Sequence, residues 1–423
     1  MSFEIVSEAP VDTIKILAQK IEGAVRAGKW VRARELNGRL AELEVSQKHT
    51  FFLHKPEALQ IELTGRCNAR CVMCSHFYEW NDCGQDLQED GIRLVENYLP
   101  FCRIAVLNGY GEPLLSNYFL PCLHLLRKYQ SSAIITTNLS VLTNEMLYEF
   151  PKVFQKINVS CNGPDAKRYE KIHQGLSFQR FQRNLKRLIE VCGGEIVCLS
   201  CVAMAETIPY ALDLVRFAGQ NGIREIRFGR LGVNSFLKNY EQDLIHYPNA
   251  ASFYFQEAEN AAKDLGIRLV FPDNFQGVYT DFHLKEELRT LHTLPFRYGN
   301  AYQPERRAAF LSCQERGEYG NPVRHYDTSL VPVDGICDWV AKGLYIDMSG
   351  AMHPCCECPS VNYNDQWNGE TARHLRGMFY SGILPAHCKN CPFIINQELS
   401  MLKCRKDPSL YRAGDYLEHK IDQ

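Results

Sequence analysis

The sequence predicts an α/β fold in which a parallel sheet, open or curled into a partial barrel, carries helices between its strands. Short apolar runs alternate with amphipathic stretches from residue 57 onward, and six strand candidates appear in this alternation. Successive strand, helix and strand segments form right-handed parallel units, so the alternation builds one parallel sheet. Chemistry in such folds sits at the carboxyl ends of the strands.

The elements are expected in the following order. Apolar positions at helical spacing over residues 11–47, with Gly28 between two halves, predict a helical hairpin within an extension over 1–50, and its basic residues are expected on a solvated face. Six strands are expected at 58–63, 103–108, 133–138, 156–161, 195–201 and 224–229, with helices at 120–130, 177–192 and 211–220 among them. A connecting part over 236–335 contains a helix at 251–265 and a strand at 267–271, and a cysteine-rich part follows over 336–423.

Composition excludes several classes of protein. The 423 residues include 47 Lys and Arg against 49 Asp and Glu, a formal net charge of −2 that predicts no general attraction to nucleic acid or to an anionic membrane. No apolar run is long enough to cross a bilayer, and the first residues lack a secretion signal, so we expect a cytoplasmic protein. In that reducing compartment, 18 cysteines indicate metal binding or catalysis rather than disulfides.

Three of these cysteines lie in one loop after the first expected strand. Cys67, Cys71 and Cys74 are separated by three and two residues, and soft thiolates at such spacing favour an iron-sulfur cluster or zinc. A structural zinc site closes with four ligands, whereas three cysteines on a four-iron cube leave one iron open to a substrate or cofactor. The number of cysteines therefore favours the cluster, with zinc as the alternative.

This spacing in this loop resembles that of the radical S-adenosylmethionine (radical SAM) enzymes. The resemblance implies a partial (β/α)6 TIM-like barrel over 51–235, a [4Fe–4S] cluster on the three cysteines and bound S-adenosylmethionine, with Met73 beside its adenine. Residues 110–113 resemble the family's glycine-glycine-glutamate-proline motif, with Tyr110 in place of the first glycine and Pro113 at the end. In that motif Glu112 would accept a hydrogen bond from the methionine amino group, and Gly111 would let the backbone approach the ligand.

Later strand ends continue the resemblance, which covers residues 58–230. Ser160, and with a weaker match Asn138, correspond to residues that border the ribose and carboxylate, while Val202 and Ala203 would lie against the adenine, mainly through their backbone. Asn162 and His173 depart from the family, which often has Asp and Arg there. The implied reaction is reductive cleavage of S-adenosylmethionine to a 5′-deoxyadenosyl radical, which abstracts hydrogen from substrate and needs an external flavodoxin-like or ferredoxin-like electron donor.

The cysteine-rich part over 336–423 resembles the SPASM/twitch extension of many radical SAM enzymes. The matching ligands are Cys337, Cys355, Cys388 and Cys391, which would close a second, auxiliary [4Fe–4S] cluster. No cysteine follows within the nine residues after Cys391, so the single-cluster twitch version is expected, and Cys356, Cys358 and Cys404 are unassigned. A fully ligated cluster would accept an electron from the substrate radical or relay electrons to the first cluster, and the first role is favoured. Structural zinc is the alternative here too.

Three functions compete. The first is an oxidoreductase for a small polar substrate (a sugar, aminocyclitol or nucleoside), favoured because the amino-terminal extension of about fifty residues is short for a peptide-leader domain. The second is a peptide maturase or an epimerase, in which Cys161, Cys201 or Cys83 would donate hydrogen. The third is a noncatalytic iron-sulfur or zinc scaffold.

Four polar residues near the strand ends are candidates for substrate contact. Arg227 and Arg230 would clamp a carboxylate or phosphate, although such arginines more often form structural ion pairs. Tyr110 and His76 lie near the expected cofactor site.

Overall fold

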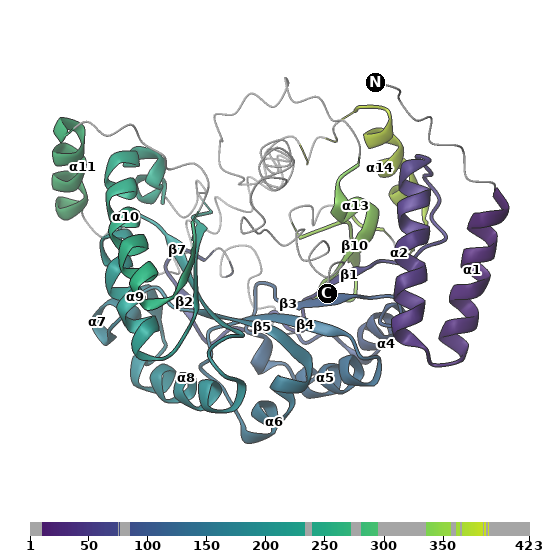
Figure 1. The fold of residues 1–423 in the computed structure, drawn as a ribbon, viewed down its shortest axis with the longest axis horizontal. Helices are drawn as coiled ribbons and strands as arrows, with labels where there is room; N and C mark the ends of the chain where they lie inside the picture. The colour runs from purple at the N-terminus through teal and green to yellow at the C-terminus, as the bar shows by residue number, and fades with distance from the viewer. Residues whose placement is uncertain are drawn as a thin grey trace.

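A computed structural model describes residues 11–74, 76, 85–232, 239–271, 281–294, 336–356, 361–363, 366–383, 385 and 388. Its centre is a curved sheet of nine strands in the order β11-β10-β1-β3-β4-β5-β7-β8-β9. Helices line the outer side of this curve, as Figure 1 shows. The predicted α/β class and partial barrel are confirmed.

Six parallel strands form the middle of the sheet in chain order. They are β1 (Ala58–Ile61), β3 (Ile104–Leu107), β4 (Ser132–Thr137), β5 (Phe154–Ser160), β7 (Val197–Ala203) and β8 (Glu225–Arg230). Each coincides with one of the six predicted strands to within two residues at both ends. The parallel strand β9 (Arg268–Val270) extends the sheet beyond β8.

Six helices connect these strands: α4 (Glu89–Tyr98), α5 (Phe119–Lys128), α6 (Asn144–Val153), α7 (Ala166–Ile172), α8 (Phe178–Cys192) and α9 (Ala211–Gln220). The sequence predicts α5, α8 and α9. It also contains cap signals that we did not use for α6 and α7, where the side chains of Thr143 and Asp165 accept hydrogen bonds from the first helical turn. Helix α10 (Pro248–Leu265) begins three residues before the predicted start, and α11 (Asp281–Thr293) follows it.

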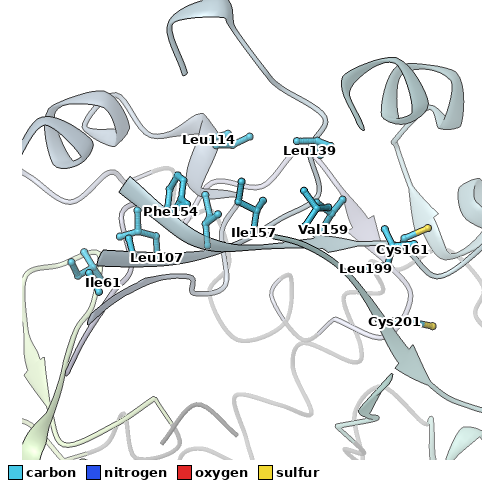
Figure 2. Close-up of a cluster of buried hydrophobic side chains, with 14 of the residues drawn as sticks. Ile61, Leu107, Leu114, Leu139, Phe154, Ile157, Val159, Cys161, Leu199 and Cys201 are labelled. Carbon is cyan, nitrogen blue, oxygen red and sulfur yellow. The ribbon is translucent and has the colours of Figure 1, made fainter. Parts of the chain in front are cut away.

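Alternate residues of each strand face the helices and form the main apolar core. In β5 and just after it these are Ile157, Val159 and Cys161, which pack with Leu199 of β7, and Figure 2 shows all four in the cluster. Neighbours in a strand point to opposite faces, so Asn158 and Ser160 face the concave side of the sheet. The concave side is therefore the more polar one along β5.

The amino-terminal hairpin consists of α1 (Val11–Arg26) and α2 (Trp30–Ser46), as predicted, and Gly28 takes a positive φ of 66° in the turn. The expectation that its basic residues are solvated is wrong for Arg34. That side chain is buried and donates to the carbonyls of Tyr129 and Gln130 and to the hydroxyl of Ser131. Arg34 therefore anchors the hairpin to the end of α5.

The carboxyl-terminal region shares the main sheet. After helix α13 (Asp338–Lys342), strand β10 (Gly343–Ile346) runs parallel to β1, and β11 (Met352–His353) returns antiparallel to β10. Helix α14 (Glu370–Tyr380) follows, and its fully buried Arg376 stacks its guanidinium on Phe52 and Trp367, 4.1 and 4.3 Å from the ring centroids. No helix among the described residues is long and apolar enough to cross a membrane.

Candidate functional site

The cysteine loop leaves the carboxyl end of β1 and is attached to the segment between α7 and α8. Its strand β2 (Arg70–Cys71) pairs antiparallel with β6 (His173–Gln174), and the N–H of Val72 donates to the carbonyl of Ile172 at 3.1 Å. Before the cysteines, Arg66 forms a bidentate ion pair with the buried carboxylate of Asp86 at 2.8 Å. The loop is thus held at both ends by interactions distant in sequence.

The three thiols of this loop are half-buried and near enough for their charges to interact. Burial, then the charges of Glu112 and Cys74, raises the pKa of Cys67 to about 12, and burial followed by Cys74 and Cys67 raises the pKa of Cys71 well above its usual value. Thiols of this kind release their protons when they bind metal. This donor set is of the soft type that iron-sulfur clusters use.

A single metal ion is a different case. Within the described part of the chain, no group of three or more His, Cys, Asp or Glu side chains is arranged to hold a metal ion. Each cysteine of a cube ligates a separate iron, so the fit to a cluster rests on the thiol chemistry of the loop.

His173 is a neighbour of this trio whose role we did not predict from the sequence. Its Nδ1 lies 3.2 Å from the Sγ of Cys71, and its Nε2 lies 3.1 Å from the backbone nitrogen of Asn162, which donates to it. Burial lowers the pKa of His173 to about 4, so the ring is neutral at ordinary pH. The pairing of β2 with β6 places it there.

Glu112 lies five residues beyond β3, directly before a short 3-10 helix, and most of the hydrogen-bond acceptor positions of its carboxylate are in use. Its carboxylate accepts hydrogen bonds from the Thr137 hydroxyl at 2.5 Å, the Asn138 N–H at 2.7 Å and the Leu114 N–H at 3.2 Å. Burial raises its pKa to about 7 despite these donors. A carboxylate offers about four acceptor positions, so about one is left for a further donor.

Gly111 is required by the protein backbone. A Cβ at this position would lie 2.1 Å from the carbonyl oxygen of Thr64 and 2.8 Å from that of Arg66. The N–H of Glu112 also donates to the Arg66 carbonyl at 2.8 Å. The glycine therefore lets the end of β3 pack directly against the start of the cysteine loop, and Pro113 begins the short 3-10 helix that follows.

Asn138 braces the cysteine loop from β4. Its Nδ2 donates to the Oδ1 of Asn68 at 3.1 Å, and the Nδ2 of Asn68 donates to the Ser140 hydroxyl at 2.8 Å. Asn68 stands next to Cys67, so this pair fixes the loop as it leaves the first cysteine. We did not predict Asn68 as a site residue because nothing in its spacing distinguishes it.

An apolar cluster forms the rim beside the third cysteine. Met73 and Val202, both predicted to lie near the adenine, pack in it with Val72, Ile172, Met204 and Leu231. The carbonyl of Val202 already accepts hydrogen bonds from Thr207 at 2.7 Å and Asn162 at 3.2 Å. Ala203 is buried in the main core on the other face of β7. The side chain of Val202 is therefore the part of this pair that faces the rim.

Ser160 ends β5 on the concave face, directly beside Ser200 of β7, and both are half-buried.

The two predicted hydrogen donors do not face the concave side. Cys161 and Cys201 belong to the helix-facing set of residues, are almost fully buried and lie in the main apolar core, where Figure 2 shows them. The reason is the alternation of side chains along a strand. Cys161 lies an even number of residues from Ile157 and Val159, and Cys201 lies two residues from Leu199, so both thiols share the helix-facing side. This placement gives no support to either thiol as a hydrogen donor. Cys83 lies outside the described residues.

The predicted arginine clamp is not formed either. Arg227 and Arg230 are three residues apart in β8, and positions an odd number apart point to opposite faces of a strand. Arg227 lies on the concave face, with an Nη2 4.0 Å from the carboxylate of Glu225. His76 is buried, and burial lowers its pKa.

Three of the four carboxyl-terminal cysteines that the structure describes are buried against the main core, and the fourth, Cys356, is half-buried. Cys337 directly precedes α13, Cys355 follows β11, and Cys388 lies beyond α14; each is less than a tenth exposed. Cys391, Cys358 and Cys404 lie outside the described residues. Three of the four predicted auxiliary ligands are thus found in the part of the chain that β10 joins to β1.

A buried carboxylate connects the two cysteine regions. Glu62, directly after β1, accepts the N–H of Tyr110 at 2.6 Å and the hydroxyl of Tyr345 of β10 at 2.7 Å. Burial raises the pKa of Glu62. Close by, Asp347 contacts the imidazole of His353 at 2.8 Å. We did not predict Glu62 or Tyr345, because only the pairing of β1 with β10 brings them together.

Comparison with known proteins gives a family match and a short relative. The model of the radical SAM superfamily matches residues 61–218. A segment of 98 residues is 31% identical to the tungsten-containing aldehyde ferredoxin oxidoreductase cofactor-modifying protein of Pyrococcus furiosus. That segment is 22% of this chain and spans only about a quarter, 27%, of the relative.

Solved structures resemble the chain over most of its length. SuiB of Streptococcus suis bound to S-adenosylmethionine has a TM-score of 0.52 at 16% identity, covering 88% of this chain and 76% of SuiB. SuiB bound to its precursor peptide SuiA gives 0.51 at 16% identity, covering 83% and 70%. At this identity the likeness shows the fold.

Proposed function

Because the chain belongs to the radical SAM superfamily through residues 61–218, we propose that it is a radical SAM enzyme that modifies a peptide. The observation that supports a peptide substrate is the fold likeness to SuiB, which extends over 83% of this chain. The SuiB structure in that comparison contains a precursor peptide. From the sequence alone a small polar substrate comes first and a peptide maturase second. The comparisons favour the peptide maturase over the enzyme for a small polar substrate.

Cys67, Cys71 and Cys74 would hold the [4Fe–4S] cluster of this superfamily. When bound, the cluster supplies the electron for reductive cleavage of S-adenosylmethionine. The protein keeps the thiols together by pairing β2 with β6 and by bracing Asn68 against Asn138. These interactions support the assignment because they hold the loop independently of any metal.

Glu112 would bind the amino group of S-adenosylmethionine with its remaining acceptor position. Three donors fix both carboxylate oxygens, so the group is oriented before the ligand arrives. Met73 and Val202 would cover the adenine from the apolar rim and keep water away from it.

The peptide would lie on the concave face of the sheet. Asn158, Ser160 and Ser200 give that face polar side chains. They would bind backbone amides, which carry both donors and acceptors. Cys337, Cys355, Cys388 and Cys391 would hold the auxiliary cluster at the β10 edge, on the evidence of their spacing and of the burial of the first three.

The test uses anaerobically prepared full-length protein with S-adenosylmethionine, a strong reductant and candidate peptides encoded beside its gene. We expect 5′-deoxyadenosine together with a change in peptide mass, and neither product from Cys67→Ala. Loss of two hydrogens would indicate oxidation, whereas a peptide whose mass is unchanged in H₂O and increases by one deuterium in D₂O would indicate epimerisation. Cofactor cleavage coupled to a small metabolite, with every peptide unchanged, would contradict the peptide proposal.

A second candidate substrate is a small cofactor molecule. One observation favours it: the relative from Pyrococcus furiosus is named a cofactor-modifying protein and shares 31% identity over 98 residues. The same assay with a small-molecule extract separates the two. Metal analysis addresses the scaffold alternative, because two cubes predict about eight irons per chain, whereas zinc without sulfide would exclude this chemistry.

A further inference from the structure

The ring of His173 has one protonation state that fits its two contacts. The backbone N–H of Asn162 donates to Nε2 at 3.1 Å, so Nε2 must present a lone pair. A neutral imidazole with a bare Nε2 carries its hydrogen on Nδ1. Nδ1, 3.2 Å from the Sγ of Cys71, is therefore a donor toward that sulfur.

The surroundings hold the ring in this orientation. His173 is fully buried, its backbone pairs with Cys71 through β6 and β2, and its ring lies 4.6 Å from that of Tyr169. The Asn162 donor is a backbone group at the end of β5, so side-chain rotation cannot remove it. The hydrogen on Nδ1 is fixed by the fold.

We infer that His173 is a positioning residue that donates an Nδ1–H hydrogen bond to the Cys71 thiolate and so raises the reduction potential of the cluster on Cys67, Cys71 and Cys74. This inference rests on the proposed function of those cysteines. Hydrogen bonds to the sulfurs are among the features that set iron-sulfur potentials. Reduction adds negative charge to the cluster and its thiolates, and an N–H directed at a sulfur stabilises that charge.

Two amide substitutions separate the contacts of the ring. His173→Gln extends its carbonyl to the Nε2 position, where it can accept from Asn162, and leaves no donor at the Nδ1 position. His173→Asn places an amide N–H at the Nδ1 position and gives up the contact with Asn162. Tyr169→Phe is the control, because it retains the packing of the ring and removes only a hydroxyl.

The readout is the midpoint potential of the cluster, measured by EPR during a redox titration without S-adenosylmethionine or substrate. We expect a more negative midpoint for His173→Gln, by about tenfold in the equilibrium constant of reduction, or about 59 mV for one electron. His173→Asn and Tyr169→Phe should retain the wild-type value. A midpoint in His173→Gln equal to wild type, or an equal shift in both histidine variants, would overturn the inference.

A measurement on the wild-type protein covers the case in which a variant does not load its cluster. Histidine labelled with ¹⁵N should give a nitrogen coupling in pulsed EPR of the reduced cluster, and its absence would overturn the inference. Iron and sulfide analysis of the same sample distinguishes failure of the proposed cluster site from failure of the role of His173. A wild-type protein without sulfide would refute the proposed cluster site, whereas an intact cluster without the coupling would refute the role of His173 alone.

Discussion

The two cysteine regions of this chain are assembled in different ways. Cys67, Cys71 and Cys74 lie within eight consecutive residues, on a loop that the β2–β6 pair and Asn68 hold in place. Cys337, Cys355 and Cys388 lie on three separate segments, which the pairing of β10 with β1 and the packing of α14 bring to the barrel. A local site can be recognised from spacing, whereas a site built from distant segments depends on the whole fold.

The largest expected effect tests the loop. Replacing Cys67, Cys71 and Cys74 with Ala should abolish formation of 5′-deoxyadenosine, because no open iron would remain, and should remove about half of the iron if two cubes are present. Liquid chromatography with mass spectrometry and iron analysis measure both. Cys122→Ala is the matched control: that thiol is buried in α5, away from both regions, and its loss should cost about 1 kcal/mol of stability.

The second effect tests the dispersed cysteines. Cys388→Ala should lower the iron content while 5′-deoxyadenosine still forms, and it should stop formation of the modified substrate if an auxiliary cluster at this site accepts the electron. The ratio of 5′-deoxyadenosine to product measures this uncoupling. Full turnover in the variant would contradict the electron-acceptor role and leave this region with a structural one.

A third, intermediate effect concerns Glu112, beside the loop. Burial raises its pKa to about 7, so the carboxyl group is protonated below that pH, while the amino group of S-adenosylmethionine requires the ionised form. The affinity for S-adenosylmethionine should therefore increase as the pH rises through 7. Below pH 7 it should decrease by up to about tenfold for each pH unit. Glu112→Gln should bind more weakly and lose this pH dependence in a calorimetric titration.

The raised pKa of Glu112 also predicts how the stability of the protein depends on pH. A raised pKa in the folded state stabilises the protein below the usual value of 4.5, and this contribution is lost as pH rises through about 7. Glu112→Gln should flatten this slope in chemical denaturation of the ligand-free protein. A slope that is unchanged in the variant would show that another group is responsible.

The smallest expected effect tests the connection between the regions. Tyr345→Phe removes the hydroxyl that donates to Glu62 at 2.7 Å and leaves a buried carboxylate with one donor fewer, at a cost of about 1–3 kcal/mol in the free energy of unfolding. Tyr148→Phe, at an exposed position, should change stability by less than about 0.5 kcal/mol. Equal effects of the two substitutions would argue against an energetic connection through Glu62.

The sequence is sufficient for the six central strands, because short apolar runs bounded by polar residues have few other interpretations. It is also sufficient for the loop, whose spacing is local. It does not place β10 in the main sheet, since nothing in Gly343–Ile346 identifies β1 as its neighbour. For the same reason Glu62, Tyr345 and the contact of His173 with Cys71 are not predictable from spacing.

One rule that was available in the sequence bears on two expectations, the thiol donors and the arginine clamp. Strand residues alternate between faces, and Ile157 and Val159 pack on the helix side, so Cys161 lies on that side too. The same rule separates Arg227 from Arg230. The position of a residue at a strand end shows where it lies along the sheet. Whether it is an odd or an even number of residues from a core residue decides which face of the sheet its side chain points to.

The parallel pairing of β10 with β1 has a consequence for shortened versions of this protein. A chain that ended before residue 336 would present the backbone N–H and C=O groups of β1 unpaired along one side of an apolar strand, and such borders recruit other strands. Self-association would then accompany the loss of the auxiliary cysteines. The carboxyl-terminal segment thus covers the exposed edge of β1 and protects it from pairing with other strands, independently of any role in electron transfer.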